Sequence, residues 1–264
     1  MIKKQKTNFF NKNLQKSIKD LKKYSKYIWF MFLLFFAIGI LGLAFPIFFE
    51  EQIINLIKNL LEKTKGLSAI ELTRFIIINN TQGAFLGLTL GIFLGIFPLF
   101  MVIVNGYVLG FVANKSISID GIFVLWKLLP HGIFEIPAIM ISAGLGLMVG
   151  FSIMRDCIKN YSKKISELAT ITLMMLSLLP FFIISILYAS NPSIESTPSI
   201  LTSILSFLSF IIFLTYMIFT FSIKKLRKSL FNNLISSLRI FIFIVIPLLL
   251  IGGIIEGILI SIIN

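Results

Sequence analysis

Six long apolar segments limit what this chain can fold into more than any other feature. Each has about 20 residues or more, enough for a helix to cross the hydrocarbon core of a bilayer. They cover residues 27–49, 83–112, 121–154, 168–189, 200–221 and 238–263. With 57% hydrophobic and 13% charged residues in 264 positions, a soluble domain could not bury this much apolar surface. We predict an all-α, polytopic helical membrane bundle with five to six apolar segments.

Several functional classes are excluded by residue type. Cys157 is the only cysteine and His131 the only histidine, so the chain has neither an internal disulfide nor a Cys/His cluster with zinc or haem spacing. The sequence also lacks a Walker A loop, Gly-x-Ser-x-Gly, His-Glu-x-x-His and paired intramembrane aspartates. We therefore expect no metal, no cofactor and none of the usual ATPase, hydrolase or membrane-protease activities.

The positive charge is concentrated at the amino terminus. The net charge is +13, and nine of the 24 Lys and Arg residues are lysines before residue 27. This distribution is typical of anchoring to an anionic inner leaflet, and we expect the lipid bilayer rather than nucleic acid as the partner. An apolar side chain recurs every three or four residues among these lysines, at Phe10, Leu14, Ile18 and Leu21. Residues 1–26 are thus predicted to form a basic cytoplasmic amphipathic helix on the leaflet, followed by one transmembrane bundle over 27–264.

The positive-inside rule orients the bundle. It places the amino terminus, the loop 155–164 and the basic cluster 224–228 in the cytoplasm, and residues 50–82 and 191–198 outside. The predicted location is the cell membrane, with several passes. In the outer segment 50–82 one helical face is apolar, which predicts either a surface helix or a partner-docking face. Its members are Ile53, Leu56, Ile57, Leu60 and Leu61.

This orientation requires an odd number of crossings between residues 82 and 155, where only two apolar segments lie. The preferred solution is a broken or re-entrant helix pair around Pro130-His131-Gly132, in the segment 121–154. A second solution has three crossings within residues 83–154, with Pro98 near a turn. A third is a simple six-span bundle with a positive external loop.

Glycine recurs at every fourth position at Gly83, Gly87, Gly91 and Gly95. Small residues on one helical face let another helix backbone approach closely. The pattern predicts either packing inside the bundle or a homo-oligomer interface. Two weaker pairs repeat it, Gly106/Gly110 and Gly253/Gly257.

Ionisable residues inside the apolar segments are the candidate functional groups. Lys127, His131 and Glu135 stand at i, i+4 and i+8, and Glu256 is the other acid inside a span. Such groups at membrane depth are costly unless they pair or face water. They could form a structural ionic latch, a transport or ligand site, or a catalytic site, and we expect Glu256 to pair with Lys127 or His131.

Helix-breaking and polar residues surround these groups. Pro130, Gly132 and Pro137 form the predicted broken-helix motif around His131. Asn79-Asn80 is predicted to mark a helix entry, although Asn79-Asn80-Thr81 also fits the N-glycosylation pattern. Asn105-Gly106 predicts a local break or an interhelical hydrogen bond.

Four of these motifs together resemble the stage II sporulation protein M family of integral membrane proteins. They are Asn79-Asn80, Asn105-Gly106 with Gly110, the string Leu129-Pro130-His131-Gly132-Ile133-Phe134-Glu135-Ile136-Pro137-Ala138, and Ile255-Glu256. The resemblance covers roughly residues 75–260, and Pro-His-Gly-x-x-Glu-x-Pro is its specific part. It implies a membrane scaffold that recruits peptidoglycan-degrading partners and is not itself known as a hydrolase.

Three functions follow as hypotheses. The first is a non-enzymatic scaffold that binds protein partners in the membrane or envelope through its glycine faces and outer amphipathic helix. The second is a transport component, a permease-like subunit that uses a buried cluster of His131, Glu135 and Glu256. The third, with the least support, is an intramembrane enzyme with His131 or Glu135 as general base.

Overall fold

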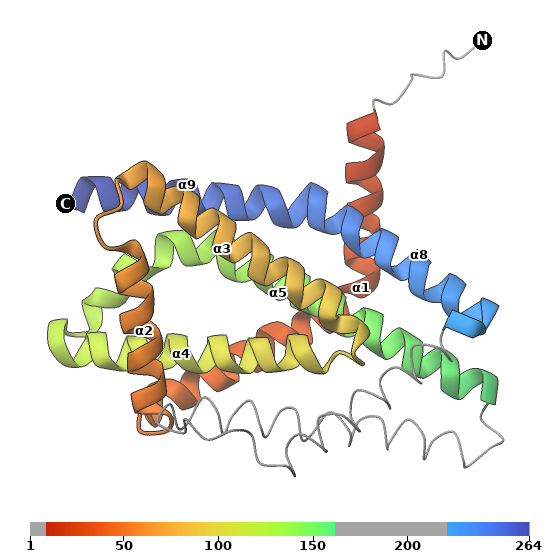
Figure 1. Cartoon of the computed structure of the whole chain (residues 1–264), viewed down its shortest axis with the longest axis horizontal. Helices are drawn as coiled ribbons and strands as arrows, with labels where there is room; N and C mark the ends of the chain where they lie inside the picture. Colours follow the sequence, from red (N-terminus) through yellow and green to blue (C-terminus); the bar gives the residue numbers. More distant parts are fainter. Residues whose placement is uncertain (1–8, 162–220, 264) are drawn as a thin grey trace, which may run out of the picture. The chain divides into compact units, whose positions relative to one another are not determined.

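The computed structural model describes residues 9–161 and 221–263 (Figure 1). Side chains are described in these ranges except at 125–131, 154, 157–161 and 260–263. The elements are α1 (Phe9–Ala44), α2 (Glu50–Thr64), α3 (Ala69–Thr89), a 3-10 turn (Leu90–Ile92), α4 (Ile96–Asp120), a second 3-10 turn (Ile122–Val124), α5 (Leu125–Tyr161), α8 (Lys224–Ile240), a π-helical turn (Phe241–Val245) and α9 (Ile246–Ile263). These ranges contain no strand, so the predicted all-α fold is confirmed. The predicted spans 168–189 and 200–221 lie outside the described residues, apart from Phe221.

The described part contains five stretches that are long and apolar enough to cross a membrane. They are Phe9–Ala44, Ala69–Ile92, Ile96–Asp120, Gly132–Ile153 and Lys224–Leu259. The chain is a multi-pass membrane protein. It divides into two compact units, residues 1–150 with 233–264, and residues 151–232. The single bundle over 27–264 stays a prediction.

Helix α1 joins the basic amino-terminal segment to the first span without interruption. In Figure 1 its amino-terminal part runs across the direction of α9. One side of this part is buried, at Ser17, Tyr24 and Ile28. It packs on the junction of α8 and α9, where the Phe10 and Phe243 ring centroids are 5.4 Å apart and Asp20 pairs with Arg239. Part of the apolar face predicted to rest on the leaflet therefore contacts protein.

The apolar segment 83–112 is divided between two helices. Helix α3 ends at Thr89, and α4 begins at Ile96 after Leu94 and Gly95, whose φ angles are 55° and 78°. A glycine adopts this left-handed conformation without the steric cost of a Cβ atom. Pro98 follows in the first turn of α4, where a proline needs no backbone partner. The chain thus turns close to Pro98, as the three-crossing solution expects.

Helix α3 begins much earlier than the apolar segment does. The Ser68 hydroxyl accepts a hydrogen bond from the Glu71 amide at 3.4 Å, and the Glu71 carboxylate accepts one from the Ser68 amide at 2.9 Å. This reciprocal capping box satisfies two amides at the helix start. The segment 50–82 therefore contains α2 and the first two-thirds of α3, and three helices lie between residues 69 and 161.

Helix α5 is not broken where the sequence predicts. It runs from Leu125 through Pro130, His131 and Gly132 to Tyr161. The carbonyl that loses its partner to Pro130 belongs to the first turn of α5, so the missing amide interrupts little of the helix. The chain changes direction earlier, at Gly121, whose φ is 76°. Residues 141–150 of α5 are all buried, which makes this stretch the centre of the first unit.

Candidate functional site

Helix α3, together with the 3-10 turn and Gly95 that follow it, meets α5 along a row of glycines. A Cβ atom at Gly91 would meet the backbone of Gly146, and one at Gly146 would meet the backbone of Gly87. A Cβ atom at Gly150 would likewise meet the backbone at Gly95. The two backbones are therefore in direct contact, as small residues permit in membrane helices. We call these five residues the glycine seam.

The first glycine of the predicted row, Gly83, makes no close contact. At Gly83 a Cβ atom would have nothing within 4 Å, whereas at Gly87 it would also lie 2.6 Å from the Met101 methyl carbon. Close packing thus begins one turn after Gly83. Of the four predicted glycines, Gly87, Gly91 and Gly95 thus make close contacts, and the chain turns into α4 at Gly95.

The pair Gly106/Gly110 packs α4 against α1. A Cβ atom at Gly106 would lie 2.7 Å from the Phe35 carbonyl oxygen, and one at Gly110 would meet the Gly39 carbonyl. Helix α4 continues through Asn105-Gly106, and Asn105 is exposed. The predicted local break is therefore absent, and Gly106 serves close packing instead.

The third pair, Gly253/Gly257, packs α9 against α3, as the side-by-side helices in Figure 1 show. A Cβ atom at Gly257 would meet the Thr73 side chain, and one at Gly253 would meet Ile77. Asn80 follows one turn later on α3 and is half-buried, while Asn79 is exposed. These asparagines lie inside α3 rather than at its entry, because the helix begins at Ala69.

Three polar side chains meet where α3, α5 and α9 converge. Glu135 of α5 is 9% exposed, receives a side-chain hydrogen bond from Asn80, and lies close enough to Glu256 for their charges to interact. Gly252 makes room for it, because a Cβ atom there would lie 2.6 Å from the Glu135 Cγ. The Glu135 Oε1 atom has no hydrogen-bond partner in the described part of the chain. We call Asn80, Glu135 and Glu256 the carboxylate cluster.

The cluster differs from the predicted pairing. Glu256 lies near another acid, Glu135, and the side chains of Lys127 and His131 are outside the described residues, so its pairing with them stays a prediction. Gly132 and Pro137 are helical positions of α5 on either side of Glu135. Two carboxylates repel when both are charged, and an amide donor beside them relieves part of that cost. No group of three or more His, Cys, Asp or Glu in the described ranges could hold a metal ion.

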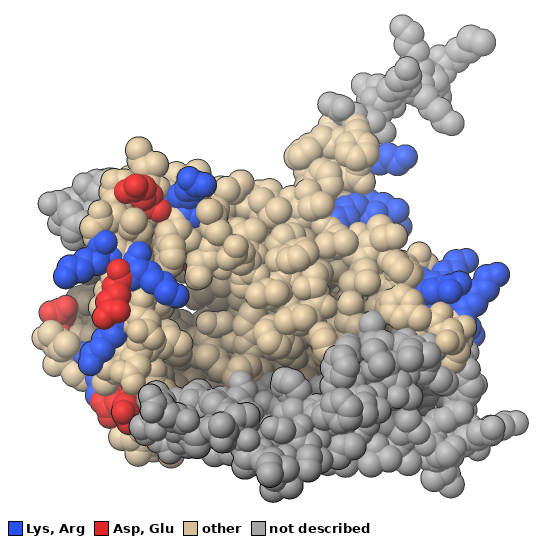
Figure 2. Space-filling model, in the orientation of Figure 1, with Lys and Arg blue, Asp and Glu red and all other residues tan. Residues whose placement is uncertain are grey.

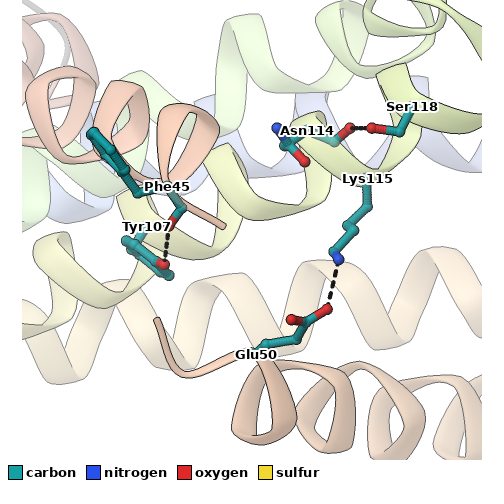
Figure 3. Close-up of polar contacts among 6 residues, drawn as sticks. All are labelled: Phe45, Glu50, Tyr107, Asn114, Lys115 and Ser118. Atoms are coloured by element: carbon teal, nitrogen blue, oxygen red, sulfur yellow. Dashed lines mark hydrogen bonds and ion pairs between the residues drawn. The ribbon is translucent and has the colours of Figure 1, made fainter. Parts of the chain in front are cut away.

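A second set of polar contacts joins α4 to the end of α1 and to the first residue of α2 (Figure 3). The Tyr107 hydroxyl donates to the Phe45 carbonyl at 2.7 Å, and the Asn114 amide donates to the Leu43 carbonyl at 2.8 Å. Lys115 forms an ion pair with Glu50 at 2.6 Å. The sequence patterns did not single out these α4 residues, although Tyr107 and Asn114 are seven apart and so share a helical face. Together they tie the end of α1 and the first residue of α2 to α4.

Helix α2 presents the predicted apolar face. Ile53 is buried, while Leu56, Leu60 and Leu61 are 42%, 40% and 63% exposed. Figure 2 shows charged side chains around α2 and the start of α3, and again along the amino-terminal part of α1. On the face shown, the surface of the first unit between these two zones carries no charge. An uncharged belt between charged ends suits a protein that spans a bilayer.

Comparison with protein families places the chain among known proteins. Residues 28–190 match the family model described as Stage II sporulation protein M, more than half of the chain. The chain belongs to the stage II sporulation protein M family. The match begins in α1 and includes α2 to α5, with Asn80 and Glu135, whereas Glu256 lies beyond it. It therefore starts and ends earlier than the region 75–260 inferred from the motifs.

A relative of this family member occurs in an archaeon. The uncharacterized protein MJ0706 of Methanocaldococcus jannaschii is 46% identical over 55 residues, which are 21% of this chain and 24% of that protein. The chain thus matches about a quarter of the length of this curated relative. No solved structure matches the chain.

Proposed function

We propose that this stage II sporulation protein M family member is a non-enzymatic scaffold that holds partner proteins at the membrane. The observation that carries the proposal is the way α2 is held. A scaffold needs a binding surface outside the bilayer whose position is fixed relative to the spans. Helix α2 leaves Leu56, Leu60 and Leu61 exposed in the described chain. Lys115 pairs with its first residue, Glu50, and the hydrogen bonds of Tyr107 and Asn114 hold the end of α1 just before it.

The apolar face of α2 suits a protein partner. Leu56, Leu60 and Leu61 lie on one side of the helix, and Lys58 and Glu62 lie on the other. An apolar strip with a charged back is the usual form of a helix that docks into a groove. The partner bound there is expected to be an envelope protein.

The number of helices supports an orientation with α2 outside and the amino terminus in the cytoplasm. Helices α3, α4 and α5 provide three crossings between α2 and the basic residues after Met154. An odd number puts these basic residues on the side opposite α2, which the positive-inside rule requires. No re-entrant segment is then needed.

The carboxylate cluster has a structural part in this proposal. Its three residues come from α3, α5 and α9, so their contacts hold together helices that are far apart in sequence. The stage II sporulation protein M family is not known for enzymatic activity. The cluster accordingly needs no substrate, and the proposal assigns it the role of a clasp.

Affinity purification from native membranes in mild detergent, with mass spectrometry of stoichiometric partners, tests the scaffold. Leu56→Ser with Leu60→Ser should abolish recovery of the partner, while Lys58→Ser with Glu62→Ser, on the other side of α2, should retain it. Both variants must reach the membrane at the wild-type level. A wild-type protein that is well folded and purifies alone would contradict the proposal, as would equal partner recovery by both variants.

A further inference from the structure

The amino-terminal part of α1 carries a straight row of lysines. Its members are Lys12, Lys16, Lys19, Lys23 and Lys26, spaced by four, three, four and three residues, and all are exposed. At 3.6 residues per turn they fall within an arc of roughly 80° over a length of roughly 21 Å. No other residue of α1 between Lys12 and Lys26 falls in that arc. We call this set the lysine row.

The charge of the row is not neutralised within the described chain. Asp20 is the only acid in this part of α1, and it is turned toward Arg239, with which it pairs at 2.5 Å. Lys23 and Lys26 lie 5.2 Å and 4.9 Å from the ring centroids of Tyr24 and Tyr27. No described ion pair involves any of the five lysines. Figure 2 shows positive side chains along this part of α1.

The packing of α1 decides which way the row faces. Ser17, Tyr24 and Ile28 are buried against protein, and the row lies on the other side of the helix. An amphipathic helix bound to a leaflet buries its apolar side in the lipid. Here protein takes part of that side, because Tyr24 and Ile28 are buried and Phe10 contacts Phe243, while Phe10 and Ile18 remain 56% and 43% exposed. The row therefore points away from the packed bundle.

We propose that the lysine row is a docking surface for an acidic helical segment of a second protein, which deepens the scaffold function and rests on it. Glutamates spaced by four and three residues on a partner helix would form a matching straight row. In the orientation proposed above the partner is cytoplasmic. The scaffold would then bind one protein through α2 outside and another through α1 inside.

The test uses the full-length protein in phosphatidylcholine nanodiscs and two labelled peptides. One is a helix-forming peptide with five glutamates spaced four, three, four and three apart, and the other has the same composition with the glutamates contiguous. Fluorescence anisotropy at low salt gives each Kd. The spaced peptide should bind about tenfold more tightly, because five weak ion pairs form together only in the matched register.

Matched variants identify the surface. Substituting Lys12, Lys19 and Lys26 by Gln should weaken binding of the spaced peptide about tenfold, the combined loss of three exposed ion pairs. Substituting the exposed Lys58, Lys63 and Lys65 by Gln removes the same charge and should leave the Kd unchanged. Equal losses in both variants, or equal binding of both peptides, would overturn the proposal.

Nanodiscs containing phosphatidylglycerol distinguish protein from lipid as the occupant. Retained binding of the spaced peptide supports the acidic partner, whereas loss of binding would mean that lipid headgroups occupy the row. These measurements use no cellular partner. A failure here therefore leaves the partner recovery through α2 untouched, and a failure of that recovery leaves these affinities unchanged.

Discussion

The glycine seam and the carboxylate cluster are two opposite ways of joining helices to α3. In the seam, the end of α3 and the turn after it meet α5 through the absence of side chains, so that backbone lies on backbone. In the cluster, α3 meets α5 and α9 through the polar side chains of Asn80, Glu135 and Glu256. The seam depends mainly on shape, with one buried hydrogen bond beside it from the Ser142 hydroxyl to the Ala84 carbonyl at 2.6 Å, whereas the cluster depends on hydrogen bonding and charge. The two joints should therefore fail under different substitutions.

The largest effect is expected when one methyl group is added to the seam. Gly91→Ala places a Cβ atom against the Gly146 backbone, which cannot move aside as a side chain can. The free energy of unfolding should fall by about 3 kcal/mol, at the upper end of the range for overpacking. Gly83→Ala is the matched control, because its Cβ atom would meet nothing and alanine favours the helix. Unfolding by sodium dodecyl sulfate in mixed micelles measures both, and equal effects would show that the backbones are not in contact.

Removing the Glu135 side chain should be the next most damaging change. Glu135→Ala leaves a cavity over Gly252 and an unpaired amide at Asn80, at a cost of about 2 kcal/mol. Glu135→Gln keeps the volume and can still bond the amide, so it should change stability by less than about 1 kcal/mol. The same unfolding titration compares the two. If Gln were as damaging as Ala, the negative charge itself would stabilise the joint, and the clasp would be ionic rather than polar.

Asn80 and Asn79 provide a sharper test of the cluster. Asn80→Ala removes the hydrogen bond to Glu135 and should cost about 1 kcal/mol. Asn79→Ala, at the exposed neighbouring position, should stay within about 0.5 kcal/mol of wild type. A larger loss of stability in Asn79→Ala than in Asn80→Ala would mean that Asn79, and not Asn80, makes the more important contact.

The smallest effect is the coupling between the two acids. Glu135→Gln and Glu256→Gln each remove the same repulsion, so the double variant gains nothing further, and the stability changes should deviate from additivity by about 0.5 kcal/mol. A double-mutant cycle in mixed micelles measures this deviation. Strict additivity would mean that the two carboxylates do not act on each other.

Much of the fold was predictable because the local patterns are strong. The apolar segments mark the spans in the described part, and the face of α2 follows from a period of three to four residues. The start of α3 was also present in the sequence, since Ser68-x-x-Glu71 is a capping-box pattern, but residues 50–82 were assigned as one outer segment in which this helix start was not recognised. The break predicted at Pro130 is absent because α5 begins only five residues earlier, at Leu125. A proline breaks a helix when it lies far from the helix start, and the sequence did not show where α5 begins.

The functional region was less predictable because it depends on contacts between distant segments. The sequence does contain a small-xxx-small pair at Gly146 and Gly150. This pair would have indicated that α5 packs against the glycines at 87, 91 and 95. The proximity of Glu256 to Glu135 has no local signal. It follows from the side that α9 turns toward α3, which is set by packing over the whole length of both helices.

The π-helical turn at Phe241–Val245 changes the direction in which the side chains of α9 point relative to those of α8. A π-helical turn accommodates an extra residue, which rotates everything after it by roughly 100° about the helix axis. Arg239 lies before the turn and is directed to α1, while Gly253 and Gly257 lie after it and are directed to α3. Deleting one residue within 241–245 would rotate Glu256, Gly253 and Gly257 away from their partners, although none of these three residues is itself changed. The number of residues in this turn therefore determines which helices α8 and α9 can contact at the same time.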